Sequence, residues 1–315
     1  MRQRAARHRW PVPPVVSDRL VRGQIVETVG GVYRVQTDAG TVEASLRGRI
    51  KHVGKRDRIV IGDYVEVGNA SGEAPVIEAA LPRRTRLSRR SSTSRFAKVL
   101  AANLDRLLMV ASVADPPPSR SVIDRMLVMG EAGGMECGIV LNKVELPGGR
   151  ALADALGAAY RKAGYQVVGT SVVTGEGIDA FRVLIHSGSS VLAGPSGVGK
   201  SSLLNAVEPG LALRTQAVGR RSRAGRHTTV SSRLITLAGG GRVADTPGFS
   251  DAGPGDVSAR DLGRCFADFR PHLGQCYFND CVHVREPGCA VLAAVEEGHI
   301  GRERHKSYQT ILAEL

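Results

Sequence analysis

The chain has 315 residues, a formal net charge of +13 and a sequence pI near 10.1. A chain of this length can form about two or three domains and bury at least one substantial hydrophobic core. Its apolar runs, such as residues 107–111, are far too short to cross a bilayer, so we expect no membrane-spanning segment. The N-terminus carries arginines with no apolar segment behind them, which argues against a secretory signal and favours a basic arm over a transit peptide.

The basic excess predicts a polyanionic partner, because Lys and Arg gain affinity for phosphate backbones by releasing condensed counterions. RNA, DNA and anionic lipid all fit, and coding bias toward Arg is the alternative explanation. The basic residues cluster in the N-terminal arm, in residues 83–98 and in residues 214–226, which favours binding. Aromatic residues are few, so we expect contact with the shape and backbone of a folded RNA rather than stacking on single-stranded bases.

Composition changes along the chain divide it into five segments. Residues 1–21 form a basic flexible arm, and residues 22–82 alternate short apolar segments with Gly and Asp turns, which predicts a five-stranded antiparallel barrel of the OB type. An SH3-like barrel stays open on strand count alone. Residues 83–102 form a basic linker, and residues 103–253 alternate strands with helices, which predicts a parallel sheet covered on both faces. Residues 254–315 are rich in Cys and His and then helical, and are expected to form a third unit.

A GxxxxGKS segment lies between the apolar strand SSVLAG and the helix-like SSLLNAV, which is the context of a phosphate-binding P-loop. Its glycines allow backbone N–H groups to face the β-phosphate, Lys200 can reach the β- and γ-phosphates, and Ser201 can ligate Mg²⁺. A Gly-rich turn without nucleotide is the alternative, and the complete motif weakens it. The candidate nucleotide-binding residues here are Gly194, Pro195, Ser196, Gly197, Val198, Gly199, Lys200, Ser201 and Ser202.

The strand RVAD ends at Asp245, and Thr246-Pro247-Gly248 follow it. A carboxylate in this position can hold the Mg²⁺ shell together with Ser201, and the N–H of Gly248 can sense the γ-phosphate. DxxG alone is a weak motif, but its spacing after the P-loop is that of a GTPase.

Asn142-Lys143-Val144-Glu145 follows the strand CGIVL and lies before the P-loop. Guanine specificity normally depends on an NKxD loop after the P-loop, whose carboxylate accepts hydrogen bonds from N1–H and N2–H of the base. Either the tetrapeptide is fortuitous, or the motif order is circularly permuted. Permutation is tolerable because the loops at the carboxyl ends of parallel strands share one edge of the sheet. Ser171, the last residue of the segment QVVGTS, lies where a base-backing loop is expected and favours permutation.

The segment Gly225 to Val230, GRHTTV, lies between the P-loop and Asp245. Thr228 or Thr229 can coordinate Mg²⁺ and close over the γ-phosphate, and the sequence does not choose between them. Phe249 follows DTPG, where Ras-like enzymes place the Gln that orients water, and an apolar side chain cannot do this. His227 is the nearest candidate catalytic residue beside Lys200, with a simply solvated histidine as the alternative.

Four potential metal ligands occur near the C-terminus in the spacing C-x4-C-x-H-x5-C: Cys276, Cys281, His283 and Cys289. Three thiolates and one imidazole predict a closed structural site for one Zn²⁺, with buried free thiols as the alternative. Cys137 and Cys265 lie in apolar segments and are expected in the core. This cysteine usage indicates a reducing compartment, and we expect a cytoplasmic protein.

NKVE before GPSGVGKSS, followed by GRHTTV, DTPGFSD and the Cys/His cluster, resembles the RsgA family of circularly permuted GTPases that assist maturation of the small ribosomal subunit. The resemblance covers nearly the whole chain. It implies an α/β circularly permuted P-loop GTPase domain between an N-terminal OB-fold barrel and a C-terminal zinc-binding helical domain. It also implies GTP hydrolysis to GDP and phosphate, Mg²⁺, one structural Zn²⁺, stimulation by the small (30S) subunit, 16S rRNA as partner, and a monomer off the ribosome. Glu145, where Asp is usual, and Val230, where the family has Thr, depart from the pattern.

Two other functions compete with this interpretation. GPSGVGKSS also resembles the loop of guanylate kinases, which predicts a P-loop kinase or ATPase, although those enzymes lack NKVE upstream and DTPG downstream. Phe249 and Glu145 are compatible with a non-catalytic RNA-binding scaffold that retains a nucleotide-binding fold.

Overall fold

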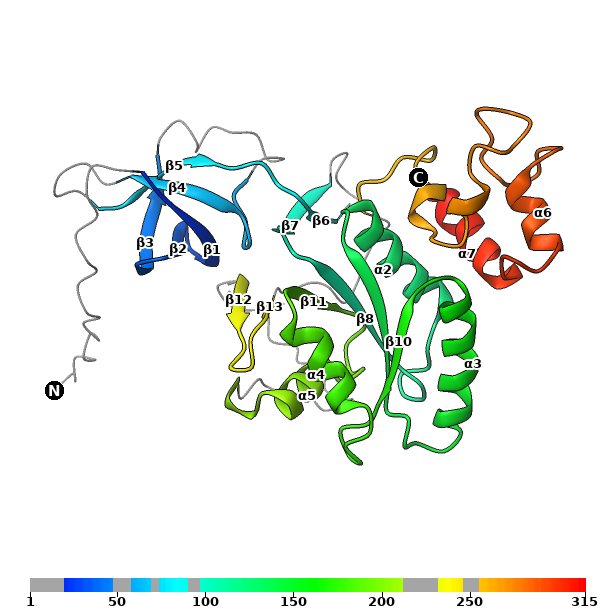
Figure 1. Cartoon of the computed structure of the whole chain (residues 1–315), viewed down its shortest axis with the longest axis horizontal. Helices are drawn as coiled ribbons and strands as arrows, with labels where there is room; N and C mark the ends of the chain where they lie inside the picture. The colour runs from blue at the N-terminus through cyan, green and yellow to red at the C-terminus, as the bar shows by residue number, and fades with distance from the viewer. Residues whose placement is uncertain (1–19, 48–57, 69–73, 90–96, 212–231, 246–254) are drawn as a thin grey trace, which may run out of the picture.

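The computed structural model describes residues 20–47, 58–68, 74–89, 97–211, 232–245 and 255–315. Three bodies follow one another along the long axis of the molecule: a barrel, a central sheet with helices, and a C-terminal helical unit (Figure 1). Of the predicted site residues, His227, Thr228, Thr229 and Gly248 lie outside the described residues. The basic cluster 214–226 and most of the N-terminal arm lie outside them as well.

The N-terminal strands form a closed barrel. They are β1 (Val21–Val29), β2 (Val32–Thr37), β3 (Gly40–Leu46), β4 (Tyr64–Gly68) and β5 (Val76–Ala80). They pair in the order β1-β2-β3-β5-β4, and β4 closes the ring on β1. Alternate residues such as Ile25, Val35 and Val65 point inward and are fully buried, as the period-2 pattern predicted. The predicted five-stranded barrel is confirmed, but one of its pairs, β3 with β5, is parallel rather than antiparallel.

The stretch expected to be a basic linker contains two strands, β6 (Arg86–Arg89) and β7 (Lys98–Ala102), which pair antiparallel. Arg83, just before them, donates two hydrogen bonds of 2.7 and 2.8 Å to the buried carboxylate of Asp63 in the barrel. The stretch is therefore anchored to the barrel by an ion pair.

The central sheet has six strands in the order β10-β9-β8-β11-β13-β12. They are β8 (Arg106–Ser112), β9 (Glu136–Asn142), β10 (Gln166–Thr170), β11 (Ser189–Ala193), β12 (Ser232–Thr236) and β13 (Arg242–Asp245). Strands β10, β9, β8, β11 and β13 are parallel to one another, whereas β12 runs antiparallel to β13. Our expectation of a wholly parallel sheet was therefore wrong at this strand, because only a short turn connects β12 to β13 and it leaves no room for a crossover.

Helices cover both faces of this sheet, as predicted. They are α2 (Arg120–Ala132) and α3 (Gly149–Lys162) on one side, and α4 (Ile178–His186) and α5 (Lys200–Val207) on the other, with a short 3-10 turn η1 (Pro209–Leu211) after α5. Each face of the sheet has its own hydrophobic core, and successive residues of β8 point to opposite faces. Leu107 belongs to the core under α2 and α3, and Leu108 belongs to the core under α4 and α5. The fully buried Tyr160 and Phe181 are the largest side chains of each core.

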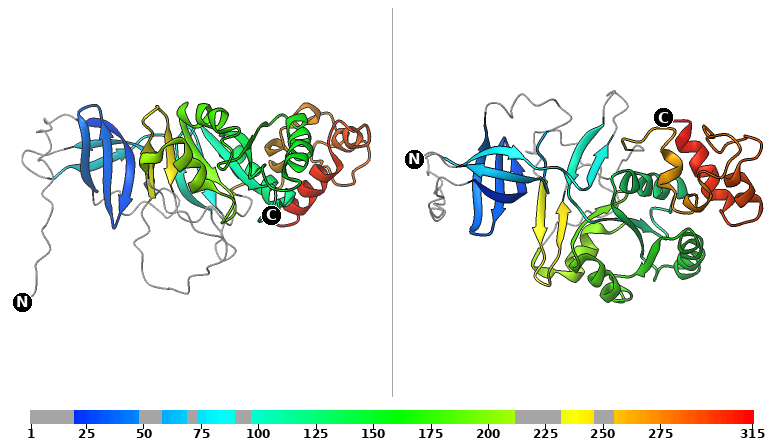
Figure 2. Two further views of the ribbon diagram at one scale, coloured as in Figure 1. Left: turned by 90° about the horizontal axis from the view of Figure 1, so that it is seen from below. Right: turned by 45° about the horizontal axis from the view of Figure 1, so that its top comes forward.

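The barrel and the central sheet share one continuous sheet, because β1 of the barrel pairs antiparallel with β12. Figure 2 shows β12 and β13 lying between the barrel and the rest of the central sheet. Arg242 on β13 also donates to the side chain of Gln24 on β1. The barrel is thus fixed directly to the two strands that precede and follow the turn at residues 237–241.

The C-terminal unit contains two 3-10 turns, η2 (Leu262–Cys265) and η3 (Arg270–His272), and two helices, α6 (Ala290–Glu296) and α7 (Arg302–Leu312). It packs on α2 through Arg304, which is 4% exposed and donates to Asp124 of α2 and, over 2.9 Å, to Asp268. Burial alone would lower the pKa of Arg304, but these two carboxylates raise it. Among the described residues, no helix is long and apolar enough to cross a membrane.

Candidate nucleotide site and metal cluster

The loops that carry the predicted nucleotide motifs all leave the same edge of the sheet. β9 ends at Asn142, β10 at Thr170, β11 at Ala193 and β13 at Asp245. These strands are parallel neighbours or next neighbours, so their carboxyl ends meet there. Segments that are far apart in the sequence are therefore brought together around one position.

Two glycines of the P-loop are required by the backbone. Gly194 has φ of +144°, and a Cβ there would collide with the carbonyl of Val110 on β8. Gly199 has φ of +101° as the N-cap of α5, and a Cβ there would collide with the side-chain amide of Asn142. The loop can pass this close to β8 and to Asn142 only without side chains at these positions.

Lys200 begins α5 and folds back over the loop. Its Nζ donates to the carbonyl oxygens of Gly194 over 2.7 Å and Pro195 over 2.8 Å. Burial lowers the pKa of Lys200, since the ammonium group is partly removed from water. Ser201 and Ser202 occupy the first turn of the same helix and are half-buried. The N-terminus of α5 and one ammonium group thus lie at the loop, where a phosphate chain can bind.

Asn142 joins the upstream motif to the P-loop. Its Nδ2 donates to the carbonyl of Val198 over 2.9 Å, a contact between residues 56 positions apart. Its Oδ1 accepts from the hydroxyl of Thr170 over 3.1 Å, and the side chain is 2% exposed. The first residue of NKVE is therefore hydrogen-bonded directly to the P-loop backbone.

The rest of this loop contains a carboxylate with an oxygen atom that is unpaired within the described part of the chain. Lys143 has φ of +68° and donates from Nζ to the carbonyl of Asp115, and Val144 is buried in the core. Among the described residues, Oε2 of Glu145 has no hydrogen-bond partner although it is buried. A buried carboxylate oxygen without a donor is unfavourable. The N1–H and N2–H groups of guanine are donors of the kind that this oxygen lacks.

Ser171 lies directly after β10, whose last residue, Thr170, pairs with Asn142. Ser171 is fully buried, and its hydroxyl accepts from the N–H of Thr174 over 3.0 Å. Its own N–H donates to the carbonyl of Glu176 over 2.9 Å. These bonds close a compact turn beside the NKVE loop, where a base-backing segment was predicted.

Asp245 is the last residue of β13 and is exposed. Its strand pairs with β11, so it ends next to the strand that leads into the P-loop and Ser201. A carboxylate and a hydroxyl at this edge are oxygen ligands of the type that Mg²⁺ prefers.

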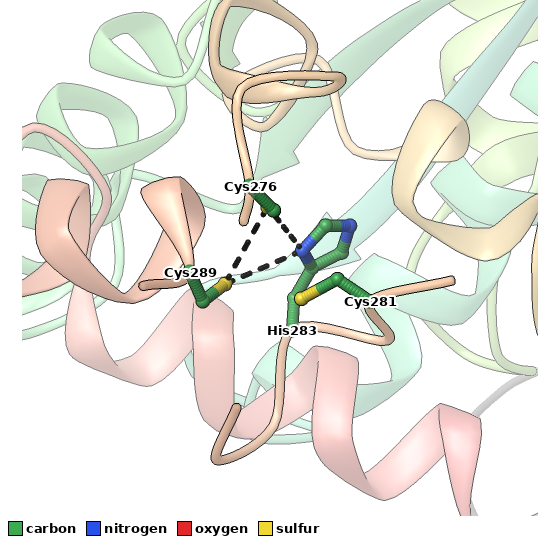
Figure 3. Close-up of side chains that lie close together, drawn as sticks. All are labelled: Cys276, Cys281, His283 and Cys289. Atoms are coloured by element: carbon green, nitrogen blue, oxygen red, sulfur yellow. Dashed lines mark hydrogen bonds between the residues drawn. The ribbon is translucent and has the colours of Figure 1, made fainter. Parts of the chain in front are cut away.

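The four predicted metal ligands also come together (Figure 3). Their ligand atoms all lie within 4.8 Å of one another. Nδ1 of His283 lies 3.5 Å from Sγ of Cys276 and 3.4 Å from Sγ of Cys289, and these two sulfurs are 3.9 Å apart. Tetrahedral zinc, with Zn–S bonds of about 2.3 Å and Zn–N bonds of about 2.0 Å, separates its ligands by about 3.5–3.8 Å. The cluster therefore fits one zinc ion.

A second layer of contacts holds this cluster in place. The ring of His305 on α7 donates from Nε2 to the carbonyl of His283 over 2.7 Å, and Tyr308 donates to the carbonyl of Val282 over 2.8 Å. Burial raises the pKa of the Cys281 thiol, and a bound cation would favour the thiolate form that binds metals. Cys137 and Cys265 are buried in the hydrophobic cores, as predicted.

Some residues of these sites were not predicted from the sequence. Thr170 directs the amide of Asn142, and its position at the end of a strand beside Ser171 is a signal that could have found it. His305 and Tyr308 support the metal cluster from a helix that begins more than ten residues after the last ligand, and no spacing rule connects them to it.

Comparison with known proteins agrees with this geometry. The model of the RsgA N-terminal domain matches residues 22–77, and that of the RsgA GTPase matches residues 80–254. The chain is 43% identical over 298 residues to the small ribosomal subunit biogenesis GTPase RsgA of Gemmatimonas aurantiaca, covering 93% of this chain and 97% of that protein. It is 38% identical over 295 residues to the protein of the same name from Moorella thermoacetica, covering 94% and 97%.

Solved structures agree as well. The crystal structure of YjeQ from Thermotoga maritima matches with a TM-score of 0.77 at 34% identity, over 94% of this chain and 99% of that one. YloQ, described as a circularly permuted GTPase, matches with a TM-score of 0.71 at 29% identity, over 94% and 95%. The chain therefore belongs to the RsgA GTPase family and is a GTP-hydrolysing enzyme with a circularly permuted nucleotide domain.

Proposed function

We propose that this GTPase acts in the maturation of the small ribosomal subunit, binds its 16S rRNA, and turns over GTP faster when the 30S subunit is bound. The names of the relatives from Gemmatimonas aurantiaca and Moorella thermoacetica support the ribosomal role. The net charge of +13 supports contact with a phosphate backbone. We further propose that the protein is cytoplasmic and monomeric off the ribosome.

The observation that carries the nucleotide assignment is the bond from Asn142 to the Val198 carbonyl, which joins the NKVE loop to the P-loop. Glu145, beside it, is the candidate ligand of the guanine N1–H and N2–H groups, because its buried oxygen lacks a donor among the described residues. Ser171 closes the turn behind the base. The residues from Gly194 to Ser202 hold the phosphates, with Lys200 offsetting their charge.

In the proposed hydrolysis, water attacks the γ-phosphorus in line, the bond to the bridging oxygen of GDP breaks, and phosphate leaves. Ser201 and Asp245 would hold Mg²⁺, which supplies charge neutralisation when bound. His227 would position the attacking water, and Thr228 or Thr229 would close over the γ-phosphate. The N–H of Gly248 would donate a hydrogen bond to the γ-phosphate. An in-line displacement of this kind depends on positioning and charge rather than on a covalent intermediate.

We also propose that Cys276, Cys281, His283 and Cys289 hold one structural Zn²⁺. The short separations among their ligand atoms support this, and so does the bond from His305 to the backbone of His283, which fixes the loop of the cluster. The metal would stabilise a C-terminal unit whose hydrophobic core is small and includes Phe266, Phe269 and Tyr308.

Hydrolysis of GTP and ATP, with and without purified 30S subunits, tests the proposed function. We expect GTP turnover that rises strongly with the subunits and little turnover of ATP. A preference for ATP would favour a P-loop kinase or ATPase, and the absence of GTP turnover under both conditions would favour a scaffold. Binding to 16S rRNA that weakens steeply with salt would support the backbone contact.

A further inference from the structure

Five charged residues of alternating sign lie in one row across five neighbouring strands. Residues directly opposite each other on paired strands project their side chains to the same face of the sheet. The register pairs Glu43 with Arg34, Arg34 with Glu27, Glu27 with Arg233, and Arg233 with Asp245. The row therefore runs from β3 of the barrel, through the β1–β12 junction, to the carboxylate proposed to hold Mg²⁺.

Glu27 is the centre of this row. Its Oε2 lies 2.8 Å from Nη1 of Arg34, and its Oε1 lies 2.5 Å from Nε of Arg233. The side chain of Glu27 is 10% exposed, whereas those of Arg34 and Arg233 are 40% and 57% exposed. One buried carboxylate of the barrel thus binds an arginine from its own domain and an arginine from the nucleotide domain.

Arg233 has a carboxylate on each side. Glu27 faces it across the β1–β12 pair, and Asp245 faces it across the β12–β13 pair. Opposite residues have Cβ atoms about 4.5–5.5 Å apart, so the guanidinium group can reach either carboxylate. In the structure it binds Glu27. If it bound Asp245 instead, it would compete with Mg²⁺ for the oxygens of that residue.

We propose that Glu27 is a positioning residue of the nucleotide site: it holds Arg233 on the barrel side and so leaves Asp245 available to Mg²⁺. This inference rests on the magnesium role proposed for Asp245. It assigns the barrel a part in setting the metal affinity of the GTPase, beyond attachment to it.

The test is a Mg²⁺ titration of the binding of a fluorescent GDP analogue to the full chain. Its readout is the Mg²⁺ concentration that half-maximally strengthens binding, together with the thermal midpoint of each variant. We expect Glu27→Gln to raise this Mg²⁺ midpoint roughly two- to five-fold, the range of one cross-strand ion pair. Addition of Arg233→Gln to Glu27→Gln should restore the wild-type value, because the competing cation is gone.

A variant of equal charge separates this account from a general change in net charge. Glu27→Gln with Arg34→Gln has the same net charge as the restoring double variant but keeps Arg233, so its Mg²⁺ midpoint should stay high. Glu66→Gln removes a comparable barrel ion pair, 3.5 Å from Arg22 across β1 and β4, and should leave the midpoint unchanged. Equal restoration by both double variants, or no effect of Glu27→Gln, would overturn the inference.

Two further variants complete the test. Arg233 is exposed, so Arg233→Gln should fold even if Glu27→Gln does not, and its midpoint should equal or fall below that of the wild type. A higher midpoint would show that Arg233 supports Asp245 and would overturn the proposal. Asp245→Asn should raise the midpoint more than any other variant. If Asp245→Asn does not raise the Mg²⁺ midpoint, the magnesium role of Asp245 is wrong. If Asp245→Asn raises the midpoint but Glu27→Gln does not, the role of Asp245 stands and only the role proposed for Glu27 is refuted.

Discussion

Replacement of Asn142 by Ala should weaken both the fold and GDP binding, because this side chain joins the NKVE loop to the P-loop. The substitution removes the 2.9 Å bond to the Val198 carbonyl and the 3.1 Å bond from Thr170, in a residue that is 2% exposed. Buried hydrogen bonds contribute about 0.5–1.5 kcal/mol each. The two together correspond to about 1–3 kcal/mol, or roughly a five- to 150-fold change in an equilibrium constant.

Part of this loss should appear as a lower thermal midpoint and part as weaker GDP binding, both measured on purified protein. Thr170→Val, which keeps the shape and removes one bond, should show about half of the effect. Thr310→Val on α7 is the matched control, since its hydroxyl donates to the exposed helix backbone at Lys306, far from the nucleotide motifs in the sequence. If Asn142→Ala changed neither the thermal midpoint nor GDP affinity, the loops would not depend on this contact, and the reasoning would be refuted.

Three further predictions address other parts of the molecule. Glu145→Gln should lower GDP affinity by roughly ten- to a hundred-fold, since charge-assisted hydrogen bonds contribute about 1.5–3 kcal/mol. An unchanged preference for guanine over adenine nucleotides in this variant would contradict the role of Glu145. Cys276→Ser, or a strong chelator, should remove about one equivalent of bound zinc by elemental analysis and lower the thermal midpoint; metal content equal to that of the wild type would contradict the cluster. Burial alone would raise the pKa of Asp105, but hydrogen bonds from Ser189 and Arg84 lower it in the folded protein. This carboxylate therefore stabilises the fold at pH values above its ordinary pKa, and the contribution is lost as the pH falls through the lowered pKa of the folded state. Asp105→Asn should therefore destabilise the protein at pH 7 but much less near pH 3 in urea unfolding, and an equal loss at both values would refute this.

The motifs that depend on local backbone geometry were predictable from the sequence. The P-loop requires glycines at fixed positions between a strand and a helix, and Gly194 and Gly199 do adopt positive φ there. The meeting of NKVE with the P-loop followed from strand parallelism, because parallel neighbours end at one edge. The metal ligands followed from spacing, because all four lie within 14 residues of one another.

Features that depend on which strands meet were not predictable. Alternation of apolar residues identifies β12 as a strand but gives neither its direction nor its partners, and it runs antiparallel to β13 and pairs with β1 of the barrel. The charged row through Glu27 and Arg233 exists only because of that register, and these residues are 206 positions apart. His305 supports the metal cluster from α7 for the same reason: tertiary packing, not spacing, places it there.

The central claim is that the reversed motifs surround one guanine nucleotide, and a crystal structure with GDP and Mg²⁺ tests it most directly. We predict that the diphosphate lies on the loop from Gly194 to Ser202 and that N1 and N2 of the base lie within about 3 Å of the Glu145 carboxylate. A diphosphate on that loop with the base directed away from Asn142 and Glu145 would contradict the account.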